Sequence, residues 1–404
     1  MKNKRVVITG IGVVSPAGTG KEKFWRNLAN GVSGIGPVQS FDCAPFTVNI
    51  GAEVRDFTAS DHMSAVEETE CGKFLRFALA AVRMAITDAD FTVSTLYGQK
   101  VALAIGTTMG DQSVERGEIE TRVDSGNWEA VKASELAGIR HCTITSYLAK
   151  KFGLTGPQFL FNNACAAGNY SLGYAADLIK DGIVNTTIAG GVDLFALTAF
   201  AGFHRLLSLA PDDCRPFDKN RKGLVLGEGA GMLILEDMEQ ALKRGVRIYA
   251  EFSGYGLGMD AYHITSPAPD GGGAIRCMEE ALQRSNLSYR DIDYISAHGT
   301  GTPSNDKYES LAIKEVFKEK TPPVSSIKSM IGHSLGAASA LEAAACCLMM
   351  ADNLMAPTIN YETPDEECVM DCVPNQARPK ELRHVISNSF AFGGNTASII
   401  LSKV

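Results

Sequence analysis

Hydrophobic and polar positions change period repeatedly along this chain, from runs typical of strands to patterns typical of helices. The apolar run Phe159 to Phe161 predicts the end of a buried strand, and Ala164 to Lys180 has apolar side chains at helical spacing. No low-complexity linker and no long run of charge interrupts this alternation. The pattern therefore predicts an α/β protein built in layers.

Two of the strand-like segments have the same character. Arg5 to Gly12 opens the chain, Arg247 to Gly256 lies in its middle, and each ends in Gly-x-Gly. If each segment opens one half of a duplicated unit, the boundary lies near residue 250, which gives halves 1–250 and 251–404. The early glycines do not fit a dinucleotide site, because Ser15 stands where the third glycine belongs.

The composition limits the class of protein. The chain is 45% hydrophobic and 21% charged, so it is able to bury a large core. Its length of 404 residues exceeds the usual size of a single core, which predicts two domains or two fused halves. A net charge of −8 argues against nucleic-acid binding, which needs clustered Lys and Arg. Without an apolar stretch of about 18 residues or a signal-peptide core, we expect a soluble, cytoplasmic protein that does not enter a membrane. The cysteines form no Cys-x-x-Cys pair, so neither disulfides nor a metal site is expected.

One cysteine stands between a short apolar run and a long helical pattern of small residues. In Asn163-Ala164-Cys165-Ala166-Ala167-Gly168, the cysteine opens the helix. A helix N-terminus has unpaired N–H groups and a partial positive charge, which lower a thiol pKa, and the thiolate is the attacking species. Cys165 is therefore the candidate nucleophile, with a lowered pKa.

Two histidines lie in segments rich in turn-forming or small residues. His298 is in a loop of Gly, Thr and Pro at the end of a short strand, and His333 precedes a small-residue helix that begins at Ala337. A positive helix end keeps imidazole neutral, which suits a hydrogen-bond donor. A single loop histidine is more often structural, so the chemistry depends on the other clusters.

Two further clusters complete the set. Glu342 lies in the otherwise apolar helix and needs a partner, and Lys328 is the nearest candidate; an ion pair and a catalytic role fit this pattern equally. At Gly393-Gly394 a strand breaks into a turn, where backbone N–H groups are able to face a ligand as in an oxyanion hole. Taken alone, the two glycines fit a plain hairpin turn better.

The four clusters together resemble the motifs of the β-ketoacyl-acyl-carrier-protein synthases, of the class II type with a Cys-His-His site. The motifs Asn-Ala-Cys-Ala-Ala-Gly, His-Gly-Thr-Gly-Thr-Pro, Lys-Ser-Met-Ile-Gly-His and Asn-Ser-Phe-Ala-Phe-Gly-Gly occur in the family's order and spacing, across essentially the whole chain. The resemblance implies an acyltransferase with a thiolase-like α/β fold, in which two similar halves pack in five αβαβα layers.

The resemblance also implies a mechanism. Cys165 takes an acyl chain from the phosphopantetheine of an acyl carrier protein. His298 and His333 then stabilise the enolate that forms when malonyl carrier protein loses carbon dioxide. The backbone N–H groups of Cys165 and Phe392 hold the oxyanion of the condensation step. These steps require no metal and no organic cofactor.

Other residues receive supporting roles from the same resemblance. Lys328 and Glu342 are expected to orient and tune the histidines, and the Phe392 ring is expected to act as a gate between the acyl pocket and the entrance. The expected substrate contacts are Thr300, Thr302, Met109, Leu224 and Phe390.

The chain also departs from the common fatty-acid enzymes. The segment from Val66 to Lys73, where relatives offer a basic surface to the carrier protein, is mostly acidic, and Leu224 stands where relatives usually have Phe. Met109 replaces a frequent Ile, and Ala166 to Tyr170 differs from the usual run rich in Thr, Ser and Gly. These departures favour the ketosynthase subunit of a type II polyketide pathway, paired with a cysteine-lacking chain length factor. A fatty-acid elongation synthase acting as a homodimer is the alternative.

Two other classes fit less well. A non-catalytic partner subunit is expected to lack the nucleophile, whereas Cys165, His298 and His333 are all present. A degradative thiolase is expected to have a second cysteine near the C-terminal glycine turn, and 390–395 contains none. The two-histidine pattern therefore favours decarboxylating condensation.

Overall fold

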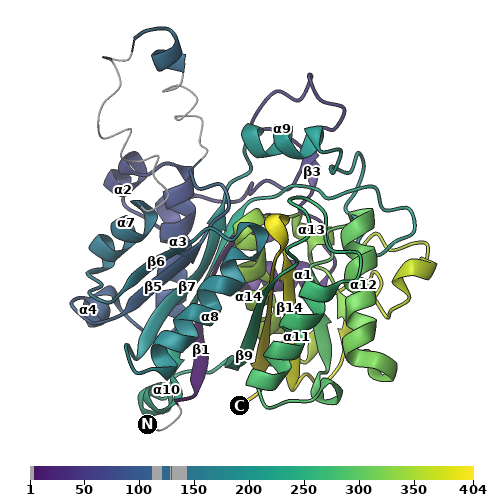
Figure 1. Ribbon diagram of the computed structural model, residues 1–404. Coiled ribbons are helices and arrows are strands. Elements are labelled where there is room, and N and C mark those ends of the chain that lie inside the picture. Colours follow the sequence, from purple (N-terminus) through teal and green to yellow (C-terminus); the bar gives the residue numbers. More distant parts are fainter. Residues whose placement is uncertain (1–3, 112–120, 128, 130–142) are drawn as a thin grey trace.

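The computed structural model describes residues 4–111, 121–127, 129 and 143–404. His141, for which the sequence suggests a surface or packing role, lies outside this part. One mixed sheet runs through the molecule in the order β11-β10-β14-β15-β9-β1-β8-β7-β5-β6 (Figure 1). Its strands are β1 (Val6–Ser15), β5 (Ala102–Gly106), β6 (Gln158–Phe161), β7 (Thr186–Asp193), β8 (Gly229–Asp237), β9 (Ala250–Met259), β10 (Tyr294–Ser296), β11 (Val324–Ser325), β14 (His384–Phe390) and β15 (Asn395–Ser402).

The sheet repeats itself on the two sides of a central strand pair. At the centre β1 and β9 pair antiparallel, through Val7 with Glu251 and Ile8 with Ala250. From β1 outwards, β8 and β7 follow antiparallel, and β5 and β6 follow parallel. From β9 outwards, β15 and β14 follow antiparallel, and β10 and β11 follow parallel. The duplicated halves expected for the fold class are therefore confirmed.

Two helices of small residues lie between the half-sheets. α8 (Ala167–Lys180) and α14 (Ala338–Asp352) pack against each other, and both contact strands of the two halves. A Cβ atom on Gly168 of α8 would lie 2.6 Å from Ser339 Oγ of α14, so the glycine permits this close packing. The window Leu335–Asp352 has the length and hydropathy of a membrane span, but 89% of it is buried inside the molecule, as in a core helix.

The outer layers cover the other faces of the half-sheets (Figure 1). α3 (Lys73–Asp88) and α7 (Thr143–Phe152) pack on the N-terminal half, and α11 (Gly272–Arg284) packs on the C-terminal half with α12 (Pro303–Phe317) against it. The predicted αβαβα order is thus confirmed. The shorter elements are β2 (Gly18–Thr19), β3 (Gly36–Pro37), β4 (Ile50–Gly51), β12 (Leu354–Met355), β13 (Arg378–Pro379), α1 (Lys21–Ala29), α2 (Ala65–Glu70), α4 (Val93–Leu96), α9 (Leu197–Arg205), α10 (Met238–Arg244) and α13 (Lys328–Ile331).

The Gly-x-Gly sequences that open the two halves serve helix packing. A Cβ atom on Gly12 of β1 would lie 1.9 Å from the Ala81 carbonyl oxygen of α3. A Cβ atom on Gly256 of β9 would lie 2.0 Å from the Cys277 carbonyl oxygen of α11. The equivalent outer helix of each half therefore lies directly on its opening strand.

The strand predicted to end at Phe161 is present, but the prediction that it is buried is wrong. Phe159 to Phe161 belongs to β6, which is the edge of the sheet, and these residues are half-buried. The rings of Phe159 and Phe161 contact Tyr174 of α8 and pack against the border of a hydrophobic core.

Candidate active site

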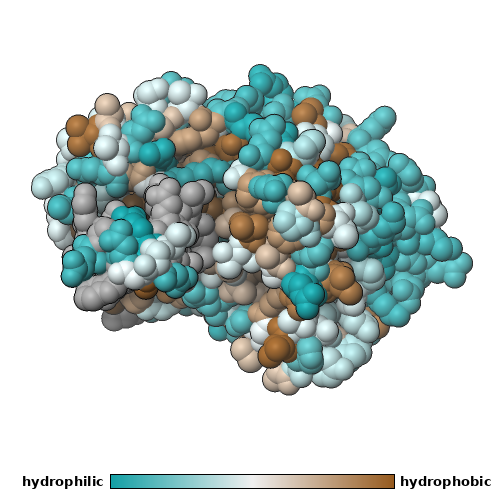
Figure 2. Space-filling model, turned by 90° about the horizontal axis from the view of Figure 1, so that it is seen from above, coloured by the Kyte–Doolittle hydropathy of each residue, from teal (hydrophilic) through white to brown (hydrophobic). Residues whose placement is uncertain are grey.

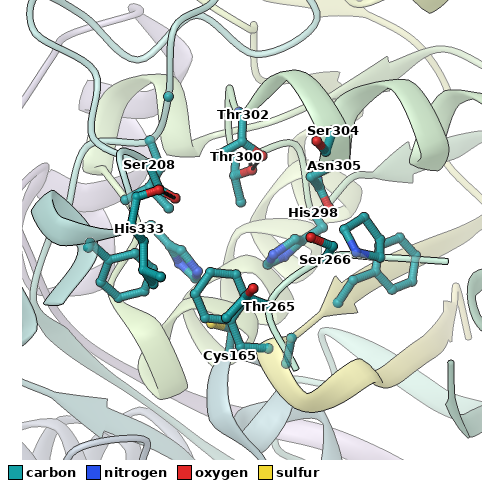
Figure 3. A pocket seen from close by; sticks show the side chains of 18 of the residues that line it. Cys165, Ser208, Thr265, Ser266, His298, Thr300, Thr302, Ser304, Asn305 and His333 are labelled. Carbon is teal, nitrogen blue, oxygen red and sulfur yellow. Dashed lines mark hydrogen bonds between the residues drawn. The ribbon is translucent and has the colours of Figure 1, made fainter. Parts of the chain in front are cut away.

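A cavity of about 330 Å³ opens where the ends of β10 and β14 meet the turns before α8 and α14. Cys165, His298 and His333 lie around its floor and point toward one another (Figure 3). The other sequence-predicted residues that line it are Thr300, Thr302, Leu224, Phe390 and Phe392. Lys328, Glu342 and Met109 lie behind its walls.

Cys165 lies in the 3₁₀ turn η3 (Ala164–Ala166), directly before α8, where the sequence predicts a helix start. The turn begins with a left-handed backbone at Ala164, φ 48°, which is strained for a residue with a Cβ atom. Ser389 Oγ of β14 donates a hydrogen bond to the Cys165 carbonyl oxygen at 2.9 Å. The C-terminal half therefore helps to hold the turn of the N-terminal half.

The lowered pKa predicted for Cys165 is wrong. The residue is 5% exposed, and burial raises its thiol pKa to about 12. The charge of Lys328 and the backbone N–H groups of Phe392 and Cys165 act in the opposite direction without compensating for burial. The resting thiol is therefore protonated, and it would have to lose its proton to act as a nucleophile.

The two histidines are fixed through their backbones. The N–H groups of His298 and Gly299, after β10, donate to the two oxygens of Glu309 at 2.8 Å each. His333 N–H donates to the Val225 carbonyl oxygen at 2.7 Å. The imidazole centroids are 5.3 Å apart with the rings at 84°, so both rings are able to face one substrate oxygen.

Both imidazoles are neutral. Burial lowers the pKa of His298 and His333 well below 6.5, and the positive charge of Lys328 lowers both further. Lys328 is fully buried and forms an ion pair with Glu342 of α14. The direction of the histidine shift agrees with the prediction, but its causes are burial and Lys328.

Phe392 contributes both its backbone and its ring. It begins the 3₁₀ turn η8 (Phe392–Gly394), in which Gly393 adopts φ 83°. Its backbone N–H hydrogen-bonds to the Cys165 thiol and lowers the pKa of that thiol. Its ring stacks on Phe203 of α9, with the centroids 5.4 Å apart. A donor at the nucleophile and a ring at the cavity wall thus come from one residue.

The predicted substrate contacts lie at two depths. The hydroxyl oxygens of Thr300 and Thr302 are hydrogen-bonded to each other at 2.9 Å in the cavity wall. Leu224 also lines the cavity and packs in an apolar cluster with Leu335 and Met109. Met109 therefore contacts the residues that form the wall and not the cavity itself. The aromatic members of this cluster are Phe41, Phe46, Phe195, Phe200 and Phe203.

Sequence reasoning missed two buried carboxylates and one ring. Burial raises the pKa of Glu309 to about 7 and that of Asp193, at the end of β7, to about 6, against the hydrogen bonds that each accepts. An acidic residue directly after the apolar sequence Gly190-Gly191-Val192 is a signal that could have found Asp193. No comparable signal marks Phe203.

The segment from Val66 to Lys73 exposes less negative charge than its sequence suggests. Glu67 is buried, caps α2 with Ser64, and forms ion pairs with Arg83 and Lys151. Lys73 pairs with the buried Glu228. The charges of Glu67 and Lys73 are therefore satisfied within the protein, which weakens the argument drawn from this segment.

The cavity entrance is partly apolar. Figure 2 shows the molecule from above, where hydrophobic groups lie among hydrophilic ones. Leu206 and Leu207 after α9 line the cavity and are 47% and 87% exposed. Lys222 also lines it.

In the described part of the chain, no group of three His, Cys, Asp or Glu side chains is arranged to hold a metal ion.

Comparisons with known proteins agree with this arrangement. The family model described as β-ketoacyl synthase, N-terminal domain, matches residues 3–241, and that of the C-terminal domain matches 249–362. The 3-oxoacyl-[acyl-carrier-protein] synthase 2 of Synechocystis sp. is 39% identical over 100% of this chain and 99% of its own length. The ishigamide ketosynthase/chain length factor matches with a TM-score of 0.95 and 41% identity, covering 100% of both chains. A type II polyketide ketosynthase solved with its acyl-carrier protein matches with a TM-score of 0.91 and 33% identity, again over 100% of both chains.

Proposed function

Because the chain belongs to the β-ketoacyl synthase family, we propose that it is the ketosynthase subunit of a type II polyketide pathway, acting with a chain-length-factor paralogue. The chemistry is the decarboxylative condensation of malonyl carrier protein with an acyl chain bound to Cys165. The observation that supports it most is the meeting of a thiol, two neutral imidazoles and a backbone N–H in one buried cavity. The identity of 41% to a ketosynthase/chain length factor favours the polyketide assignment.

In the first half-reaction, the Cys165 sulfur attacks the thioester carbon of an acyl carrier protein. The backbone N–H groups of Cys165 and Phe392 stabilise the oxyanion, each by on the order of 3 kcal/mol. The bond to the phosphopantetheine sulfur then breaks, and that sulfur leaves with the proton that Cys165 gives up. The acyl chain stays on the enzyme as a thioester.

In the second half-reaction, malonyl carrier protein enters the same cavity, where Thr300 and Thr302 contact its pantetheine arm. The bond to the malonyl carboxylate breaks, carbon dioxide leaves, and the electron pair moves to an enolate whose oxygen accepts hydrogen bonds from His298 and His333. The enolate carbon attacks the carbonyl carbon of the Cys165 thioester, the carbon–sulfur bond breaks, and the released thiolate takes a proton from solvent. The substrates arrive on the carrier protein, and the steps use no additional cofactor.

A fatty-acid elongation synthase is the second candidate. The curated relatives at 37% to 39% identity over the full chain have the name 3-oxoacyl-[acyl-carrier-protein] synthase 2, which supports this candidate. Glu67 pairs with Arg83, and Lys73 pairs with Glu228. These ion pairs weaken the argument that an acidic docking segment speaks against a fatty-acid enzyme. The two candidates differ in the partner, a paralogue or a second copy, and in the number of extensions.

The deciding experiment is mass analysis of carrier-bound products after incubation of the purified chain with malonyl carrier protein and a short acyl carrier protein. The polyketide assignment requires that product forms only when a cysteine-lacking paralogue is added, and that several units are then joined. A single two-carbon extension by the chain alone would establish the fatty-acid alternative. Cys165→Ala is the control, and product that persists in this variant would exclude Cys165 as the nucleophile.

A further inference from the structure

Asp193 connects segments of the site that are distant in sequence. It ends β7, is fully buried and accepts four hydrogen bonds. Thr107 Oγ1 and Met109 N donate to Oδ1 at 2.9 and 3.0 Å. Thr108 N and Gly336 N donate to Oδ2 at 2.7 Å each. Each oxygen of the carboxylate therefore holds two donors.

These donors belong to two segments with different tasks. The turn of Thr107 to Met109 follows β5, and Met109 packs with Leu224 behind the cavity wall. Gly336 lies three residues after His333 in the 3₁₀ turn η6 (Leu335–Ala337). Since Oδ2 accepts from both segments, one atom joins the cavity wall to the histidine turn.

The histidine turn depends on this contact because its own backbone is strained. Leu335, between His333 and Gly336, adopts a left-handed conformation at φ 51°. A Cβ atom on Gly336 would lie 2.7 Å from Asp193 Oδ2, so only glycine permits this approach. The turn therefore lies directly against the end of β7.

We infer that Asp193 is a positioning residue that couples the turn at Met109, which packs behind the cavity wall, to the histidine turn at His333. The inference rests on the proposed function. A displacement of the wall by a longer acyl chain also moves the turn that presents the imidazole. Chain-length preference and malonyl decarboxylation consequently respond to Asp193 together.

The variant Asp193→Asn tests this coupling, because an amide has one acceptor oxygen and its nitrogen donates toward N–H groups that need an acceptor. We expect decarboxylation of malonyl carrier protein to fall at least about tenfold at saturating substrate, since small displacements of catalytic groups have effects of this size. We also expect a broader distribution of product lengths. Acyl transfer to Cys165, followed by intact mass, is expected to change less than decarboxylation, because Ser389 of β14 also holds the thiol turn, even though the charge of Asp193 acts on the Cys165 thiol.

Matched variants keep the test decisive if Asp193→Asn folds poorly. Thr107→Val removes one donor to Asp193, and Thr107→Ser retains it. We therefore expect Thr107→Val to change decarboxylation and product lengths mildly, and Thr107→Ser to change neither. Asp237→Asn alters a buried carboxylate that caps α10, away from the site, and is expected to change neither.

Three outcomes would overturn the coupling. They are a change in decarboxylation with unchanged product lengths, a change in lengths with unchanged decarboxylation, and an equal loss in all three readouts, which is the result of general destabilisation. All readouts are taken with the cysteine-lacking paralogue present, and an unaltered enzyme that lacks condensation activity under these conditions would instead refute the proposed function.

Discussion

A cysteine thiol reacts as a thiolate, yet burial raises the pKa of the Cys165 thiol to about 12. The thiolate fraction therefore increases about tenfold for each unit of pH across the neutral and alkaline range. We expect the rate of Cys165 alkylation by iodoacetamide, measured by intact mass, to increase through about pH 10 without levelling. With Cys165→Ala as the background control, a plateau near pH 8.5, the ordinary thiol pKa, would contradict the raised value.

The buried ion pair of Lys328 and Glu342 leads to a prediction about the free energy of unfolding. Removing one charge leaves the other unpaired in the core, which costs about 3–5 kcal/mol. We expect Lys328→Met and Glu342→Gln each to lower the free energy of unfolding in urea. The double variant is expected to lose less than the sum of the two, because no single charge is left behind; additive losses would show that the charges do not interact.

The same double variant separates a structural role from a catalytic one. Lys328 lowers the pKa of His298 and His333, so its removal raises both toward the ordinary value. A protonated imidazole attracts the malonyl carboxylate whose loss the reaction requires, which stabilises the substrate and not the transition state. Condensation activity should therefore remain low in the double variant, most of all at acid pH, while stability recovers. Recovery of activity along with stability would limit the pair to a structural role.

The sequence predicts well which residues come together in the site, but it predicts their ionisation less well. Cys165, His298 and His333 stand in local motifs, and the cavity contains all of them. The shift of the thiol pKa was predicted with the wrong sign, because the burial of Cys165 depends on the packing of the whole molecule and no local motif reveals it. The local sequence could have marked Asp193 as buried but not its role, since its partner Gly336 lies 143 positions away.

At the scale of elements, the glycines of the two opening strands give a matched test. Alanine at Gly12 or Gly256 places a Cβ atom about 2 Å from a backbone oxygen of α3 or α11. We expect Gly12→Ala and Gly256→Ala each to cost about 1–3 kcal/mol or more of unfolding free energy, because the helix must shift. Gly202→Ala in α9, where nothing lies within 4 Å, should instead stabilise the protein by up to about 1 kcal/mol.

One result would contradict the prediction for these glycine variants. If thermal unfolding shows Gly12→Ala and Gly202→Ala with equal effects, close helix packing does not explain the Gly-x-Gly sequences. The sequence alone excluded a nucleotide site at these glycines but did not reveal their purpose, because the contacting helices lie about 70 and 20 residues further along the chain, beyond any local pattern. The edge position of β6 was unpredictable for a related reason, since strand order is set by pairing across the sheet.

At the scale of the molecule, each half holds the catalytic turn of the other. Ser389 of the C-terminal half binds the Cys165 carbonyl, and Asp193 of the N-terminal half binds the Gly336 N–H. We expect fragments 1–245 and 246–404, divided in the exposed turn after α10, to be insoluble when expressed singly. Co-expressed, they should copurify by size-exclusion chromatography and regain condensation activity. A single fragment that unfolds cooperatively would show that the halves are independent.

The same depth that keeps the Cys165 thiol protonated protects it from oxidation. Peroxide attacks exposed thiolates, and a protonated thiol that is 5% exposed offers it little. Cys277 and Cys346, whose pKa burial also raises to about 12, share this protection. The burial of Cys165 therefore slows its oxidation for as long as the cavity is empty.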